Sequence, residues 1–322
     1  MKTAIVCGSA GFLGQHMVAR LIAEGYHVRG LSRSVMHGPY EWASDHEFYT
    51  LDLRRLLPSD PFFQNVSEVY QFACEVGGLG YIADRNNDAE VLRNSTLIDM
   101  NVLDACRFNK VPKVFFASSA CVYNIPGKRF YAEADAYPAN CSNEFAWQKI
   151  YAERLYQAHA RIYGMDIRIG RLFNTYGAGM TWQGGREKSV AALCRKIAEA
   201  KDGGVIDVWG GGEQTRSYMY VSDAVEGIWR LMQYSRPNAG EPLNIGPAHE
   251  VTIRDLIRAI SRQAGKTVFS KFGDGPTGVS KICSDNTLIR ARLKWEPEIT
   301  IEQGLETTYP WIKEQVDKPQ QT

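Results

Sequence analysis

Thr3-Ala4-Ile5-Val6-Cys7-Gly8-Ser9-Ala10-Gly11-Phe12-Leu13-Gly14 is the stretch that decides the fold of this chain. An apolar run enters a turn in which glycine recurs at every third position, and apolar residues at helical spacing follow. This pattern is typical of a strand, a tight turn and a helix that bind a dinucleotide. Gly8 permits the turn, Gly11 lets the backbone approach a pyrophosphate, and Gly14 lets the helix pack closely on the strand. Phe12 and Leu13 begin the helix, whose N-terminus would face the phosphates.

Strands and helices continue to alternate through the first half of the chain. Strands are predicted over 26–31, 68–73, 114–117 and 167–172, and helices over 92–108 and 143–163. Such alternation predicts an α/β fold with a doubly wound parallel sheet. We expect residues 1–173 to form a dinucleotide-binding domain, to which parts of about 218–247 return. Residues 174–322 would form mainly a smaller C-terminal α/β domain for the substrate, in which 273–284 is predicted to be rich in loops.

The composition is that of a nearly neutral globular protein. Of the 322 residues, 44% are hydrophobic, which suffices for a sizeable core, and 37 basic side chains nearly balance 36 acidic ones. No overall field therefore favours nucleic acid or an anionic membrane. No apolar run approaches the length of a membrane span, and we expect a cytoplasmic protein. Seven cysteines without a Cys-x-x-Cys pair and six histidines without His-x-x-x-His spacing indicate reduced thiols and no metal site.

The ends of the predicted strands supply further residues for the dinucleotide. At the end of the second strand a carboxylate normally accepts hydrogen bonds from the adenosine ribose, but this chain has Ser32 and Arg33 there. A hydroxyl and a guanidinium suit a 2′-phosphate better than a bare ribose, which favours NADP over NAD; a solvated surface arginine is the plainer alternative. Asp52 and Leu53 close the next strand, where such folds cover the adenine, and Ala73 at the end of the fourth completes the predicted cofactor set.

A second stretch carries the candidate catalytic residues. The fifth strand leads into Ala117-Ser118-Ser119-Ala120-Cys121-Val122-Tyr123, and the helix that follows carries Phe145 and Lys149 one turn apart on the same face. Earlier in the chain, Gly77-Gly78-Leu79-Gly80 follows the fourth strand. Glycines at a strand end let the backbone approach a ligand, although a simple flexible turn fits this run as well.

Several motifs give the chain a family resemblance over nearly its whole length. They are residues 77–80, residues 117–123, Gly184-Gly185-Arg186-Glu187-Lys188, Trp209-Gly210-Gly211-Gly212-Glu213-Gln214-Thr215-Arg216-Ser217 and Ser284-Asp285-Asn286. The chain resembles the extended short-chain dehydrogenase/reductase family of nucleotide-sugar epimerases and dehydratases, and within it most closely the GDP-sugar 3,5-epimerases. The resemblance implies tightly bound NAD or NADP, a GDP-sugar substrate and a homodimer. It also implies transient oxidation of the sugar at C4, because a proton on a sugar carbon becomes acidic only beside a ketone.

The resemblance assigns roles to individual residues. Cys121 and Lys188 would remove and return protons at C5 and C3, Ser119 would share a hydrogen bond with the substrate O4, and Lys149 would hold the nicotinamide ribose. Each has a plainer alternative: a packed thiol, a solvated lysine or a strand-end serine. The implied substrate contacts are Gly78, Gly80, Asn174, Lys188, Lys196, Gln214 and Arg216. The segment 278–284 lacks the arginines that the family usually places near the diphosphate, and Lys281 is the candidate to replace them.

Phe145 departs from the family, because it stands where a tyrosine would act as the acid/base of the redox step. A phenyl ring moves no proton. Three explanations stay open: an engineered substitution, which we favour because the other catalytic positions are intact, a substrate that is already oxidised, or a degenerate enzyme. The competing functions are 4-epimerisation, 4,6-dehydration and non-catalytic sensing of a nicotinamide. A dehydratase would want an acidic pair beside Cys121, and neither Ala120 nor Val122 is acidic.

Overall fold

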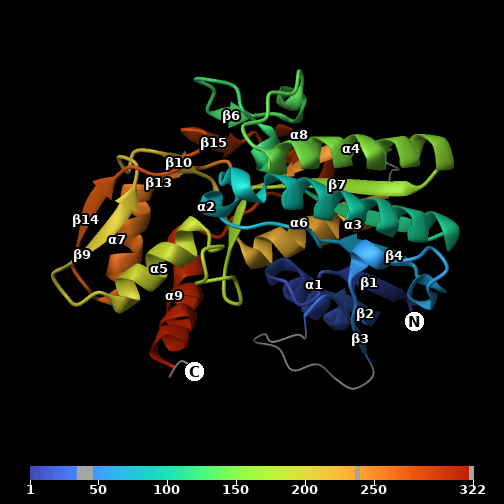
Figure 1. Cartoon of the computed structure of the whole chain (residues 1–322), viewed down its shortest axis with the longest axis horizontal. Coiled ribbons are helices and arrows are strands. Elements are labelled where there is room, and N and C mark those ends of the chain that lie inside the picture. Colours follow the sequence, from blue (N-terminus) through green and yellow to red (C-terminus); the bar gives the residue numbers. More distant parts are fainter. Residues whose placement is uncertain (35–45, 236–239, 319–322) are drawn as a thin grey trace.

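The computed structural model of the chain describes residues 1–34, 46–235 and 240–318. Its centre is a seven-stranded sheet in the order β12-β7-β5-β4-β1-β2-β3 (Figure 1). The strands are β1 (Thr3–Cys7), β2 (His27–Ser32), β3 (Glu47–Thr50), β4 (Glu68–Gln71), β5 (Lys113–Ser119), β7 (Asp166–Leu172) and β12 (Pro242–Ile245). All neighbouring pairs are parallel. The predicted doubly wound parallel sheet is therefore confirmed.

Helices cover both faces of this sheet. On one face lie α1 (Phe12–Ala23), α6 (Val221–Gln233) and α8 (Thr287–Leu293), whose buried side chains pack with those of alternate strand positions such as Val6. On the other face α3 (Asp88–Phe108) and α4 (Glu144–Tyr163) run side by side over Ile5 and Cys7 (Figure 1). Since side chains alternate along a strand, a sheet buried on both faces reads as a continuous apolar run. This accounts for the apolar character of the first strand.

The strand order reverses between β1 and β4. Chain connections run from β1 outward to β3 on one side, and from β4 outward to β12 on the other. Loops that leave the carboxyl ends of β1 and β4 therefore diverge and open a crevice at this edge of the sheet. Ligands of open α/β sheets bind at such a switch point. The glycine turn after β1 and the glycine run after β4 both lie there.

A second, smaller group of elements packs around its own core. It consists of α5 (Ser189–Glu199), β9 (Gly204–Trp209), α7 (Ile253–Ala264), β14 (Val268–Gly273) and α9 (Ile301–Asp317). β9 and β14 form a parallel pair, and Figure 1 shows the group to the left of the large sheet. Both α6 and β12 follow α5 in the chain, yet they pack on the large sheet.

Short strands join the two groups. One small sheet has the order β13 (Val251–Thr252), β10 (Thr215–Arg216), β15 (Lys281–Ser284) and β6 (Phe130–Tyr131). Another pairs β8 (Asn174–Tyr176) with β11 (Tyr218–Tyr220). The loop expected over 273–284 therefore ends in a strand. Ser280 accepts a hydrogen bond from the backbone N–H of Thr215 at 3.0 Å, which brings this part of the chain against β10.

A buried ion pair fixes α4 against the sheet. Arg171 of β7 donates to both carboxylate oxygens of Glu153 at 2.8 and 2.6 Å, and both side chains are almost fully excluded from solvent. Ser118 at the end of β5 donates to the same carboxylate, and the third guanidinium nitrogen of Arg171 donates to the Tyr123 hydroxyl at 2.9 Å. Burial alone would lower the pKa of Arg171, but Glu153 outweighs it and the pKa is raised. The helix that carries Phe145 and Lys149 is thereby tied to the strand that delivers Cys121.

Candidate functional site

Two adjoining cavities lie at the carboxyl edge of the large sheet. The first, of about 450 Å³, is lined by all the residues predicted to hold the dinucleotide, namely Gly8, Gly11, Phe12, Leu13, Gly14, Ser32, Arg33, Asp52, Leu53, Ala73 and Lys149. The second, of about 500 Å³, reaches toward α5 and β9 of the smaller group. We call them the cofactor cavity and the substrate cavity.

The glycine turn makes the floor of the cofactor cavity. Gly8 has a φ of +81°, a conformation that side chains rarely adopt, and a Cβ on Gly14 would stand only 2.1 Å from the Gly8 carbonyl oxygen. Gly11 precedes α1 without a side-chain cap, so the first N–H groups of the helix face the cavity free of local acceptors. Free N–H groups at a helix N-terminus bind phosphate. The residues present therefore fit a dinucleotide pyrophosphate.

The adenosine end of this cavity holds two paired arginines. Arg54 donates to both oxygens of Asp52, at 2.6 Å for the shortest contact, and to Asn94 at 3.2 Å. Its hydrogen bonds lower the pKa of Asp52 to about 2. Arg33 is half-exposed and lies 3.7 Å from the carboxylate of Glu75. The guanidinium that favoured a 2′-phosphate in the sequence thus has an acidic neighbour, and Arg54 is a cation that the sequence reasoning missed.

The two cavities share a short edge. Both are lined by Ser119, Phe145 and Lys188, whereas Cys121 lines only the substrate cavity and Lys149 only the cofactor cavity. The structure therefore brings the five predicted catalytic positions around one place. It is the place at which the sugar of a bound substrate and the nicotinamide of a bound dinucleotide would meet.

The end of β5 positions Ser119 and Cys121. Ser119 caps a short 3₁₀ turn over Ala120–Val122, and its hydroxyl oxygen accepts a hydrogen bond from the Cys121 N–H at 3.2 Å. A serine hydroxyl that accepts one hydrogen bond still has its own hydrogen to donate, so Ser119 can also donate to a ligand. Cys121 is half-buried beside it and is a free thiol.

The start of α4 positions Phe145 and Lys149. Asn143 caps the helix by accepting from the Ala146 N–H at 3.0 Å. Lys149 is buried, donates to the Ala117 carbonyl at 2.9 Å, and has its ammonium 4.8 Å from the ring centroid of Phe116 and 5.6 Å from that of Phe145. The face of an aromatic ring attracts a cation. Phe145 therefore stabilises the ammonium group but offers it no hydroxyl.

Lys188 lines both cavities just before α5. Its side chain is exposed to solvent, but the cavity walls around it displace part of its hydration and lower the pKa of the amine, a shift that negative charge on Cys121 or Cys74 would oppose. The preceding segment lies directly on the glycine run. The N–H of Gly78 donates to the Arg186 carbonyl at 2.8 Å, and a Cβ on Gly78 would stand 2.1 Å from the Glu187 carbonyl oxygen. Gly78, predicted as a substrate contact, thus also contacts the backbone that carries Lys188.

Most of the other predicted substrate residues line the substrate cavity. Gly80, Asn174, Lys196, Gln214 and Arg216 do so, and Trp209, which the sequence reasoning did not assign, lies beside Gly80. Arg216 donates to the carbonyls of Thr215 at 2.7 Å and Thr277 at 2.5 Å, and burial lowers its pKa. The prediction for Lys281 does not fit the structure. Lys281 is exposed at the start of β15 and is not part of the cavity wall, to which its neighbour Ile282 contributes.

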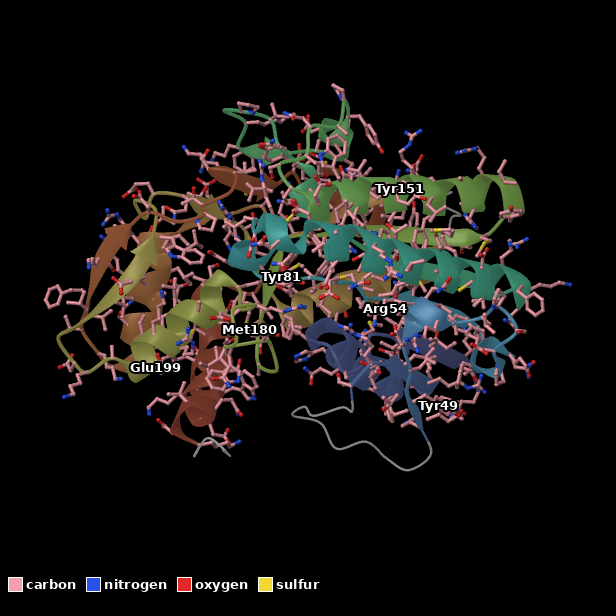
Figure 2. The ribbon with its side chains drawn as sticks, in the orientation of Figure 1. Tyr49, Arg54, Tyr81, Tyr151, Met180 and Glu199 are labelled. Atoms are coloured by element: carbon pink, nitrogen blue, oxygen red, sulfur yellow. The ribbon has the colours of Figure 1, made fainter. Side chains whose placement is uncertain are left out.

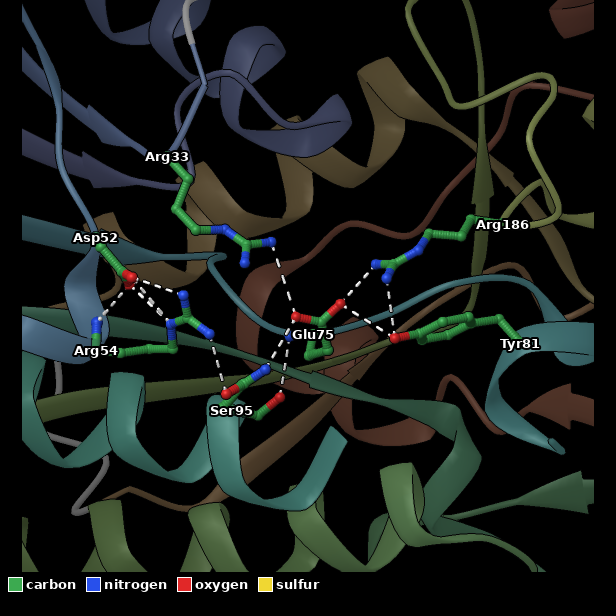
Figure 3. Close-up of polar contacts among 8 residues, drawn as sticks. Arg33, Asp52, Arg54, Glu75, Tyr81, Ser95 and Arg186 are labelled. Atoms are coloured by element: carbon green, nitrogen blue, oxygen red, sulfur yellow. Dashed lines mark hydrogen bonds and ion pairs between the residues drawn. The ribbon is translucent and has the colours of Figure 1, made fainter. Parts of the chain in front are cut away.

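Glu75 is the functional-site candidate that the sequence reasoning missed altogether. It follows β4, is buried, and accepts hydrogen bonds from Arg186 at 2.6 Å and from the Tyr81 hydroxyl at 3.2 Å (Figure 3). Tyr81 in turn accepts from Arg186 at 2.9 Å. In Figure 2, Tyr81 lies near the middle of the molecule, where the two groups of elements meet. An acidic residue between the end of β4 and the glycine run was the available signal.

The described part of the chain contains neither a candidate metal site nor a candidate membrane-spanning helix. Within residues 1–34, 46–235 and 240–318, no group of three or more histidine, cysteine or acidic side chains could hold a metal ion. In the same described part of the chain, no helix is both long and apolar enough to cross a membrane.

Comparison with known proteins places the chain among sugar-nucleotide enzymes. The sequence model of the NAD dependent epimerase/dehydratase family matches residues 4–246. The chain is similar to GDP-mannose 3,5-epimerase 1 of Oryza sativa subsp. indica, with 35% identity over 317 residues that cover 97% of this chain and 82% of the relative. It is also similar to GDP-mannose 3,5-epimerase of Arabidopsis thaliana, with 34% identity over 322 residues and the same coverage. GDP-L-fucose synthase of Escherichia coli (strain K12) is 28% identical over 312 residues, which cover 90% of this chain and 96% of the relative.

Solved structures share the fold. UDP-glucose 4-epimerase from Thermotoga maritima, with UDP-glucose, has a TM-score of 0.86 at 22% identity and covers 98% of this chain and 100% of its own. UDP-glucuronic acid 4-epimerase from Bacillus cereus, in complex with UDP-glucuronic acid and NAD, has a TM-score of 0.85 at 23% identity and covers 97% and 99%.

Proposed function

Because this chain belongs to the NAD-dependent epimerase/dehydratase family, we propose that it is a nucleotide-sugar epimerase that inverts C5 and C3 of a GDP-linked hexose. The observation that carries the proposal is the placement of Cys121 and Lys188. A thiol that follows β5 and an amine that precedes α5 line the same cavity, and the amine also lines the adjoining cofactor cavity. Inversion of a carbon centre needs proton removal on one face and proton return on the other. The similarity to the two GDP-mannose 3,5-epimerases supports the same reaction.

Each side chain of this site has its own role in the proposed reaction. The residues of the cofactor cavity would hold a nicotinamide, whose chemistry is reversible hydride transfer with C4, and the C4 hydroxyl proton would pass to water because Phe145 accepts none. Ser119, whose oxygen is already engaged by the Cys121 N–H, donates its hydrogen to the substrate O4. Cys121 removes the proton made acidic by the C4 ketone, and Lys188 supplies one from the opposite face. Lys149, which donates to the Ala117 carbonyl, would hold the nicotinamide ribose of the bound cofactor.

The cofactor and the assembly follow from the same proposal. The glycine floor fits the pyrophosphate common to NAD and NADP. Arg33 and Arg54 both line the cofactor cavity and would favour the 2′-phosphate of NADP, although each already has an acidic partner, Glu75 and Asp52 respectively. A homodimer would cover the exposed Met100 of α3 and Trp147 and Tyr151 of α4. Mass spectrometry of the dinucleotide released from the purified protein distinguishes NAD from NADP directly.

Phe145 favours a second candidate reaction. Its ring is buried, lines both cavities and has no group that could accept the C4 hydroxyl proton. A sugar that already carries a ketone at C4 needs no such base. In this second candidate reaction the chain inverts C5 and C3 of a GDP-4-keto sugar. A preceding dehydrogenase or dehydratase would supply that sugar.

Proton exchange in deuterated water tests both reactions. GDP-mannose and GDP-4-keto-6-deoxymannose are each incubated with the protein, and loss of the C5 and C3 proton signals is followed by NMR. We expect Cys121→Ala to abolish exchange. Cys141→Ala should not, because Cys141 is also a half-buried free thiol but contributes to neither cavity wall. If both substrates keep their protons with the unaltered chain, the proposed function is wrong.

Phe145→Tyr separates the two candidates. Because a general base contributes typically about 10²- to 10⁴-fold, this variant should raise turnover of GDP-mannose by that order while leaving exchange of the keto sugar nearly unchanged. A tyrosine variant that gains nothing with any GDP-hexose would leave only the second candidate. Rapid exchange of GDP-mannose by the unaltered chain would remove the need for that candidate.

A further inference from the structure

Glu75 lies between two arginines that belong to different parts of the site. Arg186 donates to one carboxylate oxygen at 2.6 Å, and Arg33 approaches the other at 3.7 Å (Figure 3). Asn94 donates to the second oxygen at 3.4 Å, and the Glu75 N–H donates to the Ser95 hydroxyl at 3.0 Å, so α3 holds both the backbone and the side chain of this residue. Burial by itself would raise the pKa of Glu75, but the two arginines outweigh it and lower the pKa. The carboxylate is therefore charged at neutral pH.

Arg186 is held by more than one contact. Its second guanidinium nitrogen donates to the Tyr81 hydroxyl at 2.9 Å, and the guanidinium lies 4.0 Å from the centroid of the Tyr81 ring. A planar guanidinium that donates to two oxygens and stacks on a ring has its orientation fixed. Glu75 and Tyr81 together therefore determine where residue 186 lies.

The residues on either side of Arg186 determine how its anchoring affects the position of Lys188. Gly184 and Gly185 have φ values of +88° and +81°, and a Cβ on either would meet nothing within 4 Å, so the chain is loosely packed just before the anchored part. Glu187 is anchored by Arg195 of α5 at 3.2 Å. Lys188 then accepts, through its carbonyl, from the Ala192 N–H at 2.9 Å and begins α5. Arg186 is thus the first anchored side chain after a loose glycine pair and lies two residues from the amine.

We propose that Glu75 is a positioning residue, which through Arg186 holds the amine of Lys188 at the edge shared by the two cavities. This inference rests on the proposed function, in which Lys188 transfers a proton. Glu75 itself touches no reacting atom. Its removal would release the Arg186 side chain and leave the backbone between the glycine pair and Lys188 with fewer anchors, and a displacement of about 1 Å at a reacting group costs on the order of 10²-fold in rate.

Glu75→Gln tests the proposal, and Glu226→Gln is its matched control. Glu226 is also a carboxylate between two arginines, Arg20 at 2.6 Å and Arg230 at 2.5 Å, but it lies on α6 and lines neither cavity. The first measurement is the rate of tryptic cleavage after Arg186, which requires the arginine side chain to be free. We expect cleavage to be faster in Glu75→Gln than in the unaltered chain, and unchanged in Glu226→Gln.

The second measurement is the exchange of the sugar C5 proton. Glu75→Gln should lower kcat by about 10- to 100-fold with KM nearly constant, because the defect is in the placement of the amine and not in the hold on the nucleotide. Arg186→Lys, which keeps a positive charge but loses the second donor to Tyr81, should retain part of the rate. Thermal unfolding of each variant shows whether the fold is intact.

The outcomes separate this inference from the proposed function. If Glu75→Gln matches Glu226→Gln in both cleavage and kcat, the inference is wrong. Faster cleavage of Glu75→Gln with an unchanged kcat also overturns the inference. In that case the contact between Glu75 and Arg186 would hold the segment but would not position the amine of Lys188. If the unaltered chain exchanges no proton from either sugar, the proposed function fails, and the inferred positioning of Lys188 for proton transfer fails too. The cleavage rates still decide whether Glu75 holds Arg186.

Discussion

Gly78→Ala should reduce proton exchange by about 10²-fold without unfolding the chain. Gly78 has a φ of −66°, which alanine adopts without strain, so the substitution acts through contact alone. The new Cβ would stand 2.1 Å from the Glu187 carbonyl oxygen and 3.3 Å from the Lys188 Cα, whereas ordinary contact begins at 3.4 Å. Both neighbours are backbone atoms, so the segment must retreat by about 1.3 Å. A shift of about 1 Å at a reacting group is sufficient for this loss.

The assay is the exchange of the sugar C5 proton with deuterated water, measured beside a matched glycine control. Gly273→Ala serves as the control, because a Cβ there would meet nothing within 4 Å and the position lies at the end of β14, outside both cavity walls. We expect the control to retain the unaltered rate, and both variants to retain their bound dinucleotide. If Gly78→Ala exchanges protons as fast as Gly273→Ala, then close packing of the glycine run on residues 186–188 does not place Lys188.

Three further predictions concern the cofactor, the proton donor and the core. Gly14→Ala puts a Cβ 2.1 Å from the Gly8 oxygen, and mass spectrometry should then find no bound dinucleotide. Full retention of the dinucleotide would contradict its binding on the turn of Gly8, Gly11 and Gly14. Enclosure lowers the pKa of Lys188 below the usual 10.5, so exchange that needs its ammonium should decline on the alkaline side with a midpoint below that value; a midpoint at or above it would contradict this role. Glu153→Ala leaves Arg171 buried without its partner and should lower the free energy of unfolding by about 3–5 kcal/mol in urea, and a loss below 1 kcal/mol, as for a surface pair, would refute this.

Local patterns were sufficient to predict the sheet, and the residues predicted to hold the cofactor line one cavity. The turn at Gly8, Gly11 and Gly14 and its helix are consecutive in sequence, so their meaning can be read from spacing alone. The long helix expected over 143–163 is present as α4, because Asn143 caps it and its apolar residues recur at helical spacing. β6 was not predicted, since its two residues are too few to show a period. β14 was also not predicted, although exposure alternates along its six residues.

Contacts between distant parts of the chain could not be predicted. Glu75 and Arg186 are separated by 111 residues, and a single carboxylate after a strand does not reveal its partner. Gly78 was expected beside the substrate as a flexible approach point, yet its lack of a side chain is also needed by the backbone at Glu187. Lys281 was placed near the diphosphate by its position in a motif, but alternation along β15 turns Ile282 inward and leaves Lys281 exposed.

The two residues proposed to transfer protons come from different groups of elements. Cys121 follows β5 of the large sheet, and Lys188 precedes α5 of the smaller group, so a sugar held between them becomes a physical link across the molecule. A ligand that binds only the folded arrangement raises its stability by mass action. We therefore expect a nucleotide sugar to protect both groups together against heat and proteases. The reactive thiol would then be shielded from oxidants for as long as substrate is abundant, and would be most vulnerable when substrate runs short.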